Sequence, residues 1–273
     1  MRLDRVVAAR GLARSRSHAH DLITTGHVLV DGALEQRPSR DVVDGVAVTL
    51  VEGIDPYVSR AAHKLVGALD AFASLGLTVV GRRAVDAGAS TGGFTQVLLE
   101  RGVSHVTAID VGHDQLAQVV RDDPRVTVIE GVNVRDLEAT SPGSGADLVV
   151  ADLSFISLTL VVAPLAALAA NDADLVLLVK PQFEVGRRRL DKQGVVTSLR
   201  DRAGAVAKVC EAVRLEGLEI VSLVESVLPG PSGNVEFFLW VRRPWQARGV
   251  AVQPSLDEEA LAKAIATIVE RRP

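Results

Sequence analysis

Three charged side chains stand at the ends of strand-like runs, where the chain could use them for chemistry. Asp152 ends one apolar run, Lys180 ends the next, and Glu236 begins the last. Since ligands bind where the carboxyl ends of parallel strands meet, and a reversed final strand would start at the same edge, these side chains should converge. Lys64, on a helix before the first strand, could close the group. A lysine held between carboxylates can help to move a proton or stabilise a developing negative charge.

Each of these residues alone could instead be a solvated surface charge, as most charged side chains are. Lys180 is the most distinctive, because it directly follows the apolar run Val176-Leu-Leu-Val179 and precedes a proline. A charge that closes an apolar strand and precedes a rigid residue is well placed to be held in one position.

A glycine-rich turn between a strand and a helix, Asp86-Ala-Gly-Ala-Ser-Thr-Gly-Gly-Phe94, is the second chemical feature. Such a turn brings backbone close to a ligand and directs amide N–H groups at it. Its spacing, D-x-G-x-x-x-G-G, does not fit the G-x-G-x-x-G fingerprint of dinucleotide-binding proteins. It resembles the first motif of S-adenosylmethionine (SAM) methyltransferases; the alternative is a tight turn without a ligand. The resemblance implies that the methionine end of the cofactor is held by Asp86, Gly88, Ser90, Gly92, Gly93 and Phe94.

Asp110 ends the second strand of the same region. An acidic side chain there can accept both hydroxyls of an adenosine ribose, but NAD would use the same contact, so Asp110 does not separate the two cofactors. A carboxylate that ends a strand without any ligand is the third possibility. The methyltransferase resemblance implies an adenine contact at Asn133 and further cofactor contacts from Val111 and Asp152.

Residues 1–53 have the pattern of a separate small unit. Two short helices, the second capped by Ser15, precede the strand Val28–Val30, an Asp31-Gly32 turn and the run 46–51, which together predict a small hairpin. The first 30 residues carry five arginines against two aspartates, in a chain whose net charge is −4.

This unit resembles the small RNA-binding module of ribosomal protein S-four, through the segments 10–16, 21–23 and 26–32. Arginines on a short helix and its preceding turn can pair bidentately with phosphates. The resemblance implies RNA contacts from Arg10, Arg14, Arg16 and His27. The alternative is a solvated basic helix face.

The rest of the chain alternates strands and helices after a predicted linker at 54–59, which defines a second domain over 60–273. Strands are expected at 84–86, 106–110, 126–130, 148–152, 175–180, 220–226 and 235–241, and helices at 60–75, 93–101, 114–121, 157–169, 199–216 and 255–271, the last capped by Ser255 with Glu258. Such alternation predicts a largely parallel sheet covered on both faces. A turn rather than a helix precedes the last strand, so that strand should be antiparallel. The predicted fold class is α/β, a Rossmann-like SAM-methyltransferase sheet of seven strands, preceded by a small α+β RNA-binding domain.

Lys64, Asp152, Lys180 and Glu236 match the K-D-K-E tetrad of the FtsJ/RrmJ-like ribose 2′-O-methyltransferases. With the N-terminal module, nearly the whole chain resembles the TlyA family, through the segments 58–69, 86–94, 150–157, 180–186 and 229–238. The resemblance implies SAM-dependent 2′-O-methylation of cytidine in ribosomal RNA, of the large subunit and for some members of the small subunit. Ribosomal RNA or a ribosomal subunit is the implied partner. The family also carries an old haemolysin label.

The 2′-hydroxyl is a poor nucleophile and must lose its proton, which leaves two roles for Lys180. A neutral Lys180 could take the proton, but two nearby carboxylates favour the charged form. A cationic Lys180 would stabilise the developing alkoxide, while Asp152 accepts the proton. The sequence leaves both open.

Further RNA contacts are interpreted in Arg187–Arg189, which follow the strand that ends at Lys180, and in Arg60, at the start of the helix expected at 60–75. The alternative for the three arginines is a plain solvated loop. Phe155 or Phe183 could stack on a base turned out of the RNA, although the low aromatic content, 3%, favours core positions for both.

Composition narrows the remaining possibilities. A single cysteine excludes an internal disulfide and fits a reducing, cytoplasmic setting. No apolar run is long enough for a membrane span, which argues against a membrane-acting haemolysin, and no metal site is predicted. The chain could also be a non-catalytic ribosome-assembly factor, or a methyltransferase for protein or small molecules. The intact tetrad argues against an assembly factor, and the basic N-terminal unit argues against a protein or small-molecule substrate.

Overall fold

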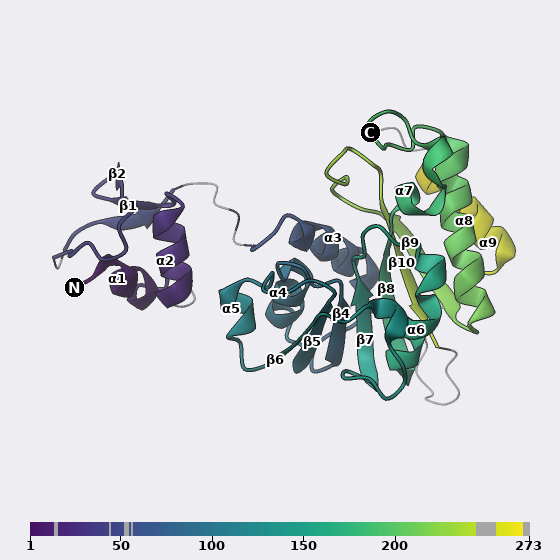
Figure 1. Ribbon diagram of the computed structural model, residues 1–273, viewed down its shortest axis with the longest axis horizontal. Coiled ribbons are helices and arrows are strands. Elements are labelled where there is room, and N and C mark those ends of the chain that lie inside the picture. The colour runs from purple at the N-terminus through teal and green to yellow at the C-terminus, as the bar shows by residue number, and fades with distance from the viewer. Residues whose placement is uncertain (14–15, 44, 52–54, 56, 244–254, 270–273) are drawn as a thin grey trace.

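The computed structural model describes residues 1–13, 16–43, 45–51, 55, 57–243 and 255–269 (Figure 1). The chain forms a small N-terminal unit and a larger α/β unit, each with its own buried apolar cluster. The predicted boundaries at 53 and 60 stay a prediction, since residues 52–54 and 56 lie outside the described residues.

The N-terminal unit packs two helices on a small antiparallel sheet. Its elements are α1 (Leu3–Ala9), α2 (Arg16–Thr24), β1 (Val28–Val30), β2 (Ala33–Leu34) and β3 (Val48–Leu50). The strand order is β2-β1-β3, so the predicted hairpin is only partly right. The turn at Asp31 and Gly32, both with positive φ, leads into β2, and β3 pairs with the other side of β1. Both residues of β2 are exposed, so no alternation of buried and exposed residues in the sequence indicates this strand.

The large unit is built on a seven-stranded sheet of order β6-β5-β4-β7-β8-β10-β9. Its strands are β4 (Arg83–Ala87), β5 (His105–Asp110), β6 (Val126–Glu130), β7 (Ala146–Ala151), β8 (Ala169–Val179), β9 (Glu219–Glu225) and β10 (Phe237–Arg242). β10 is antiparallel to both of its neighbours, whereas the pairs from β6 to β8 are parallel. The predicted fold class, including the reversed last strand, is confirmed.

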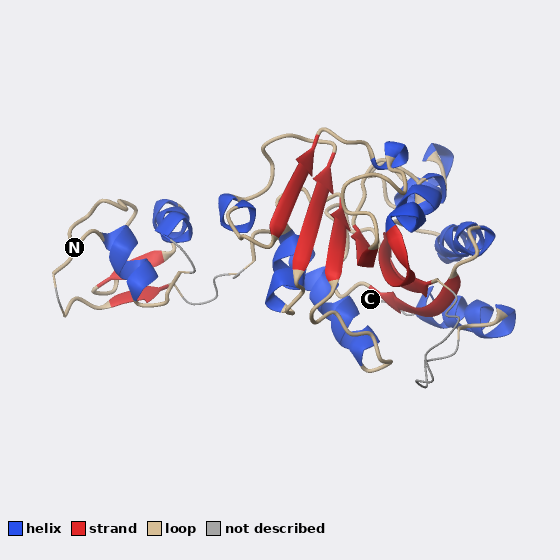
Figure 2. Ribbon diagram, turned by 90° about the horizontal axis from the view of Figure 1, so that it is seen from below, coloured by secondary structure: helices blue, strands red, loops and turns tan. Residues whose placement is uncertain are grey.

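Helices cover both faces of this sheet (Figure 2). They are α3 (Ala61–Ala73), α4 (Gly93–Glu100), α5 (Gln118–Arg121), α6 (Val162–Leu168), α7 (Pro181–Glu184), α8 (Leu199–Leu215) and α9 (Glu258–Val269), with 3-10 turns η1 (Val134–Asp136), η2 (Leu158–Leu160) and η3 (Arg187–Arg189). Successive strand side chains point to opposite faces. Leu148 and Val150 therefore pack in the cluster of α3 and α4, whereas Val149 and Ala151 pack in that of α6, α8 and α9.

Three helix predictions need correction. The helix expected at 114–121 begins only at Gln118, because Asp114 has a positive φ and Ala117 is extended. The helix expected at 157–169 is split into η2 and α6 by Val161, whose φ of −127° is not helical. The last helix begins at Glu258, and Asp257, rather than Ser255, caps it by accepting a hydrogen bond from the Ala260 N–H at 2.8 Å.

Candidate active site

Lys180 and Asp152 form an ion pair at the carboxyl edge of the sheet. Asp152 directly follows β7 and Lys180 directly follows β8, and these two strands are neighbours. Lys180 Nζ lies 2.6 Å from Asp152 Oδ1 and donates a hydrogen bond to Ser154 Oγ at 2.9 Å. Both charged side chains keep some solvent contact, 11% for Lys180 and 15% for Asp152.

Lys64 and Glu236 form a second ion pair, which is buried. Lys64 Nζ, on α3, lies 2.5 Å from Glu236 Oε2, just before β10, and the two side chains are 5% and 1% exposed. The other oxygen, Glu236 Oε1, accepts a hydrogen bond from Gln182 Nε2 at 3.2 Å. Gly230 passes so close that a Cβ there would lie 2.5 Å from Glu236 Oε1. The four predicted residues thus meet as two ion pairs, and Gln182 is a contact that sequence reasoning missed.

A cavity of about 580 Å³ lies beside the Lys180–Asp152 pair. Six residues predicted to bind the cofactor line it: Gly88, Ser90, Asp110, Val111, Asn133 and Asp152. The sequence analysis missed Gln115, Val134, Arg135, Leu153, Ser154, Phe155 and Ile156, which also line it. Such a volume is that of an ordinary small-molecule site.

The Asp110 carboxylate is held by backbone. Its Oδ2 accepts from the Ser90 N–H at 2.8 Å and its Oδ1 from the Gly112 N–H at 2.7 Å. Each carboxylate oxygen has a second lone pair, so both can still accept a hydroxyl from a ligand in the cavity. Asn133 is also fixed, because its side chain accepts from the Arg135 N–H at 3.0 Å and caps η1.

Asp86 is fully buried at the end of β4. Its Oδ2 accepts a hydrogen bond from Thr95 Oγ1 at 2.6 Å, while Oδ1 has no hydrogen-bond partner among the described residues. Burial raises the pKa of Asp86 to about 7, and the negative charges of Asp152 and Asp110 add to this. A buried polar atom without a partner is uncommon, but Asp86 itself does not line the cavity, so it supports the glycine-rich loop from below.

The glycines of the loop have different tasks. Gly88 has a φ of +84°, and a Cβ there would lie 2.6 Å from the backbone oxygen of Asp152. Gly92 and Gly93 lie at the start of α4, where a Cβ on either would clash with neighbouring side chains or backbone. Phe94 is buried against Phe238, with ring centroids 6.0 Å apart. Gly92, Gly93 and Phe94 therefore support the loop from the core and do not line the cavity.

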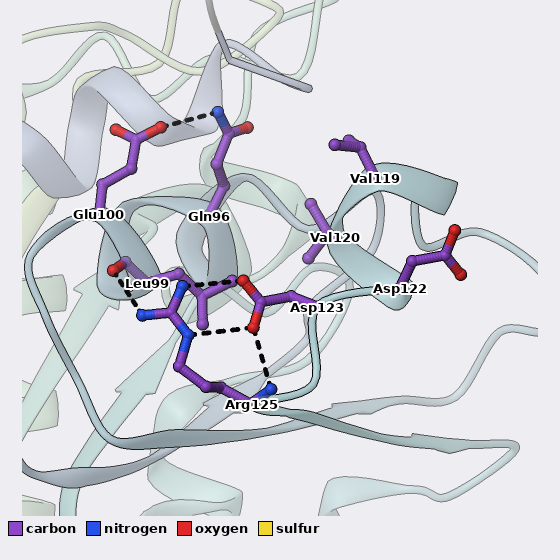
Figure 3. A pocket seen from close by; sticks show the side chains of 8 residues that line it. All are labelled: Gln96, Leu99, Glu100, Val119, Val120, Asp122, Asp123 and Arg125. Carbon is purple, nitrogen blue, oxygen red and sulfur yellow. Dashed lines mark hydrogen bonds and ion pairs between the residues drawn. The ribbon is translucent and has the colours of Figure 1, made fainter. Parts of the chain in front are cut away.

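A second hollow, of about 290 Å³, lies between α4 and α5 (Figure 3). Its polar groups are largely paired with one another. Arg125 binds Asp123 at 2.8 Å and donates to the Leu99 carbonyl at 3.1 Å, and Gln96 donates to Glu100 at 3.1 Å. This hollow contains none of the predicted site residues.

The predicted RNA contacts are spread over both units, and several have partners within the protein. Arg10 donates to the Val46 carbonyl at 2.8 Å, and Arg16 pairs with buried Asp4 at 3.0 Å. Burial raises the pKa of Asp4, but hydrogen bonds from Arg2 and Arg16 outweigh this and lower it. His27 Nδ1 lies 2.7 Å from Thr25 Oγ1. Arg14 lies outside the described residues.

In the large unit, Arg60 donates to the Pro229 carbonyl at 2.6 Å and so holds the turn that precedes Glu236. Arg187 and Arg188 are exposed on η3, whereas Arg189 pairs with Asp201 at 2.8 Å. Arg60 therefore contacts the turn that leads to Glu236, whereas Arg187–Arg189 follow α7 in the chain.

The expectation that Phe155 belongs to the core is wrong. Its side chain is 92% exposed, with a positive φ of 64°, and its ring centroid lies 5.4 Å from that of Phe183. The turn after β7 projects it outward beside Ser154, so the low aromatic content misled the prediction.

Two negative findings concern the described residues. They contain no helix of the length and apolarity needed to cross a bilayer. They also contain no group of three or more histidine, cysteine or acidic side chains arranged to hold a metal ion.

Known proteins resemble the chain over nearly its full length. The FtsJ-like methyltransferase family matches residues 57–243, and the S4 domain matches residues 1–48. The 16S/23S rRNA (cytidine-2′-O)-methyltransferase TlyA of Mycobacterium tuberculosis (strain H37Rv) is 50% identical over 264 residues, 94% of this chain and 97% of that one. Hemolysin A of Brachyspira hyodysenteriae is 37% identical over 243 residues, 87% and 98% of the two chains. A solved structure described as a hemolysin from Streptococcus thermophilus superimposes with a TM-score of 0.70 at 30% identity, over 98% of this chain and 95% of that one.

Proposed function

The chain belongs to the TlyA family of FtsJ-like methyltransferases, and on that basis we propose that it transfers a methyl group from SAM to the ribose 2′-hydroxyl of a cytidine in ribosomal RNA. The observation that carries the proposal is the Lys180–Asp152 pair at the wall of the cavity, backed by the buried Lys64–Glu236 pair. We propose ribosomal RNA of the large subunit as substrate, with the small subunit as a second target to be tested, and the cytoplasm as the place of action.

The cavity fits SAM in its size and donor set. Asp110 presents two fixed carboxylate oxygens to a ribose, and Gly88 leaves room where a side chain would meet backbone. Asn133 lines the part of the cavity reached from η1, where an adenine would lie. SAM, when bound, supplies an electrophilic methyl group, so the protein must chiefly position the attacking hydroxyl and manage its proton.

The contacts of Lys180 favour a cationic role. A carboxylate 2.6 Å away stabilises the ammonium form by direct Coulomb attraction. The directed hydrogen bond of Lys180 goes to Ser154, and Asp152 Oδ1 makes no hydrogen bond among the described residues. The Asp152 carboxylate, whose Oδ1 faces the ammonium at 2.6 Å, would accept the hydroxyl proton, while the ammonium stabilises the alkoxide that develops.

Two features support RNA as the substrate. The N-terminal unit matches the S4 domain, and the exposed Arg187 and Arg188 lie only a few residues after Lys180. Contacts between arginine and phosphate position a strand without reading its sequence. The exposed ring of Phe155, beside Ser154, is suited to stack on the base of a nucleotide turned outward.

The test is methyl transfer from labelled SAM to 23S and 16S ribosomal RNA and to intact subunits, with the modified nucleotides mapped. We expect Lys180→Ala to lower transfer by at least about a hundredfold while SAM still binds. Lys263→Ala, an exposed lysine on α9, is the matched control and should keep full activity. Near-normal transfer by Lys180→Ala would refute its role. Tight binding to ribosomal subunits without any transfer would instead support an assembly factor.

A further inference from the structure

The two ion pairs of the site lack a direct link. In the described part of the chain, no hydrogen bond or ion pair joins Lys180 or Asp152 to Lys64 or Glu236. Their relative position nevertheless matters, because a displacement of about 1 Å between groups that act on one substrate costs much of the rate. Something in the fold must fix it.

Gln182 makes the missing connection. It lies two residues after Lys180, on the four-residue helix α7, and its Nε2 donates to Glu236 Oε1 at 3.2 Å. A carboxylate held by Lys64 carries no proton to donate, so the amide nitrogen of Gln182 must face it. The amide oxygen therefore points elsewhere.

That amide oxygen is buried and has no hydrogen-bond partner among the described residues. A buried acceptor without a donor weakens folding, and an apolar side chain of similar length would avoid the loss. The hydrogen bond to Glu236 is therefore the feature that an amide at position 182 provides and a hydrocarbon would not.

Helix α7 is held firmly enough to transmit this contact. Pro181 starts it, and the Phe183 N–H donates to the Lys180 carbonyl at 2.9 Å. At its other end, the buried Glu184 accepts from the Leu158 N–H at 2.7 Å and from Ser157 Oγ, which ties α7 to the turn after Asp152. Because Gln182 on α7 is hydrogen-bonded to Glu236, this helix also fixes the position of Lys180 relative to Glu236.

We propose that Gln182 is a positioning residue for methyl transfer, which sets the Lys64–Glu236 pair in register with the Lys180–Asp152 pair. This inference rests on the proposed function. Gln182 acts on turnover, and other residues bind SAM and RNA.

The test compares Gln182→Met and Gln182→Glu with the wild-type protein. Gln182→Met keeps the length of the side chain and removes the hydrogen bond. We expect kcat to fall roughly tenfold to a hundredfold, the loss typical of a hydrogen bond to a charged group, while KM for RNA and Kd for SAM change less than about twofold. The melting temperature should change little, because the substitution removes the orphaned amide oxygen of Gln182 but also leaves Glu236 Oε1 without its donor. Gln118→Met, which removes a glutamine–carboxylate hydrogen bond of 2.6 Å on the surface of α5, is the matched control and should keep full activity.

Gln182→Glu tests the hydrogen bond through a pH dependence of kcat that a packing role of Gln182 would not produce. Two carboxylates in hydrogen-bond contact can both be accommodated only if they share a proton. The kcat of this variant, relative to wild type, should recover by about tenfold as pH is lowered from 8.5 to 6.5, since the introduced carboxyl group, once protonated, can donate to Glu236 again.

A kcat of Gln182→Met within about twofold of wild type would overturn the proposal. So would a parallel loss of melting temperature and of SAM binding, which would mark a packing residue. Wild-type protein that transfers no methyl would overturn both this inference and the proposed function, whereas active wild type with an unaffected Gln182→Met would overturn this inference alone.

Discussion

The buried carboxyl group of Asp86 should make the stability of the free protein fall as pH rises. Its pKa in the folded state is about 7, against an ordinary value of 3.8, chiefly because burial disfavours the charged form. Between these two values the folded state holds a proton that the unfolded chain has lost. The stabilising contribution is therefore complete below about pH 4 and is lost as pH rises through 7.

The size follows from the difference of about three pKa units. At about 1.4 kcal/mol for each unit, Asp86 contributes a change of about 4 kcal/mol between pH 4 and 7, and about 3 kcal/mol of it between pH 5 and 7. Asp86→Asn removes the titration but keeps an oxygen that can accept from Thr95 Oγ1. Between pH 5 and 7, the free energy of unfolding of wild type should therefore fall by about 3 kcal/mol more than that of Asp86→Asn.

The assay is urea unfolding followed by tryptophan fluorescence at several pH values. Trp240 is buried on β10, in the same sheet as Asp86, so its fluorescence reports on the unit that holds Asp86. Asp70→Asn, at an exposed carboxylate on α3, is the matched control and should track wild type. Parallel stability curves for wild type and Asp86→Asn between pH 5 and 8 would refute the reasoning.

Two further substitutions test the geometry of the site. Gly88→Ala places a Cβ 2.6 Å from the Asp152 carbonyl oxygen at a positive φ, so SAM affinity measured by calorimetry should fall at least tenfold, whereas Gly81→Ala, with a positive φ but nothing within 4 Å, should bind SAM as wild type does. Equal effects of the two would show that φ strain alone, and not the close approach, is responsible. Lys64→Met leaves Glu236 buried without its cation and should cost about 3–5 kcal/mol in urea unfolding, while Lys64→Met with Glu236→Leu should recover most of that stability without recovering activity. Recovery of methyl transfer in the double variant would remove the pair from the mechanism.

The sequence predicted the sheet well because apolar strands that end in charged residues are a local pattern. Asp86, Asp110, Asp152 and Lys180 were all expected at strand ends, and β4, β5, β7 and β8 do end next to them. Short elements were predicted poorly. β2 and α7 are two and four residues long, too short for a period of 2 or 3.6 to be recognised.

The pairing within the site could not be predicted either. Gln182 carries no charge and lies in a segment without a periodic pattern, yet it contacts Glu236, 54 residues later in the chain. Such contacts depend on which strands become neighbours. Because β10 is inserted between β8 and β9, Glu236 lies next to the end of β8 and not on the outermost strand of the sheet. The same holds for Phe155, whose exposure follows from the turn that carries it and not from its residue type.

The exposure of the two ion pairs separates their roles within the predicted tetrad. Lys64 and Glu236 are 5% and 1% exposed, so a ribose hydroxyl cannot reach them without displacing protein, and their charges act on the site through Gln182 and α7. Lys180 and Asp152 are 11% and 15% exposed, and Asp152 lines the cavity itself. A buried pair loses most of its Coulomb gain to desolvation, so its value lies in holding a geometry and not in adding stability. The tetrad is therefore better understood as one reacting pair and one supporting pair, and loss of Lys180 should impair the proton and charge chemistry where loss of Lys64 impairs its alignment.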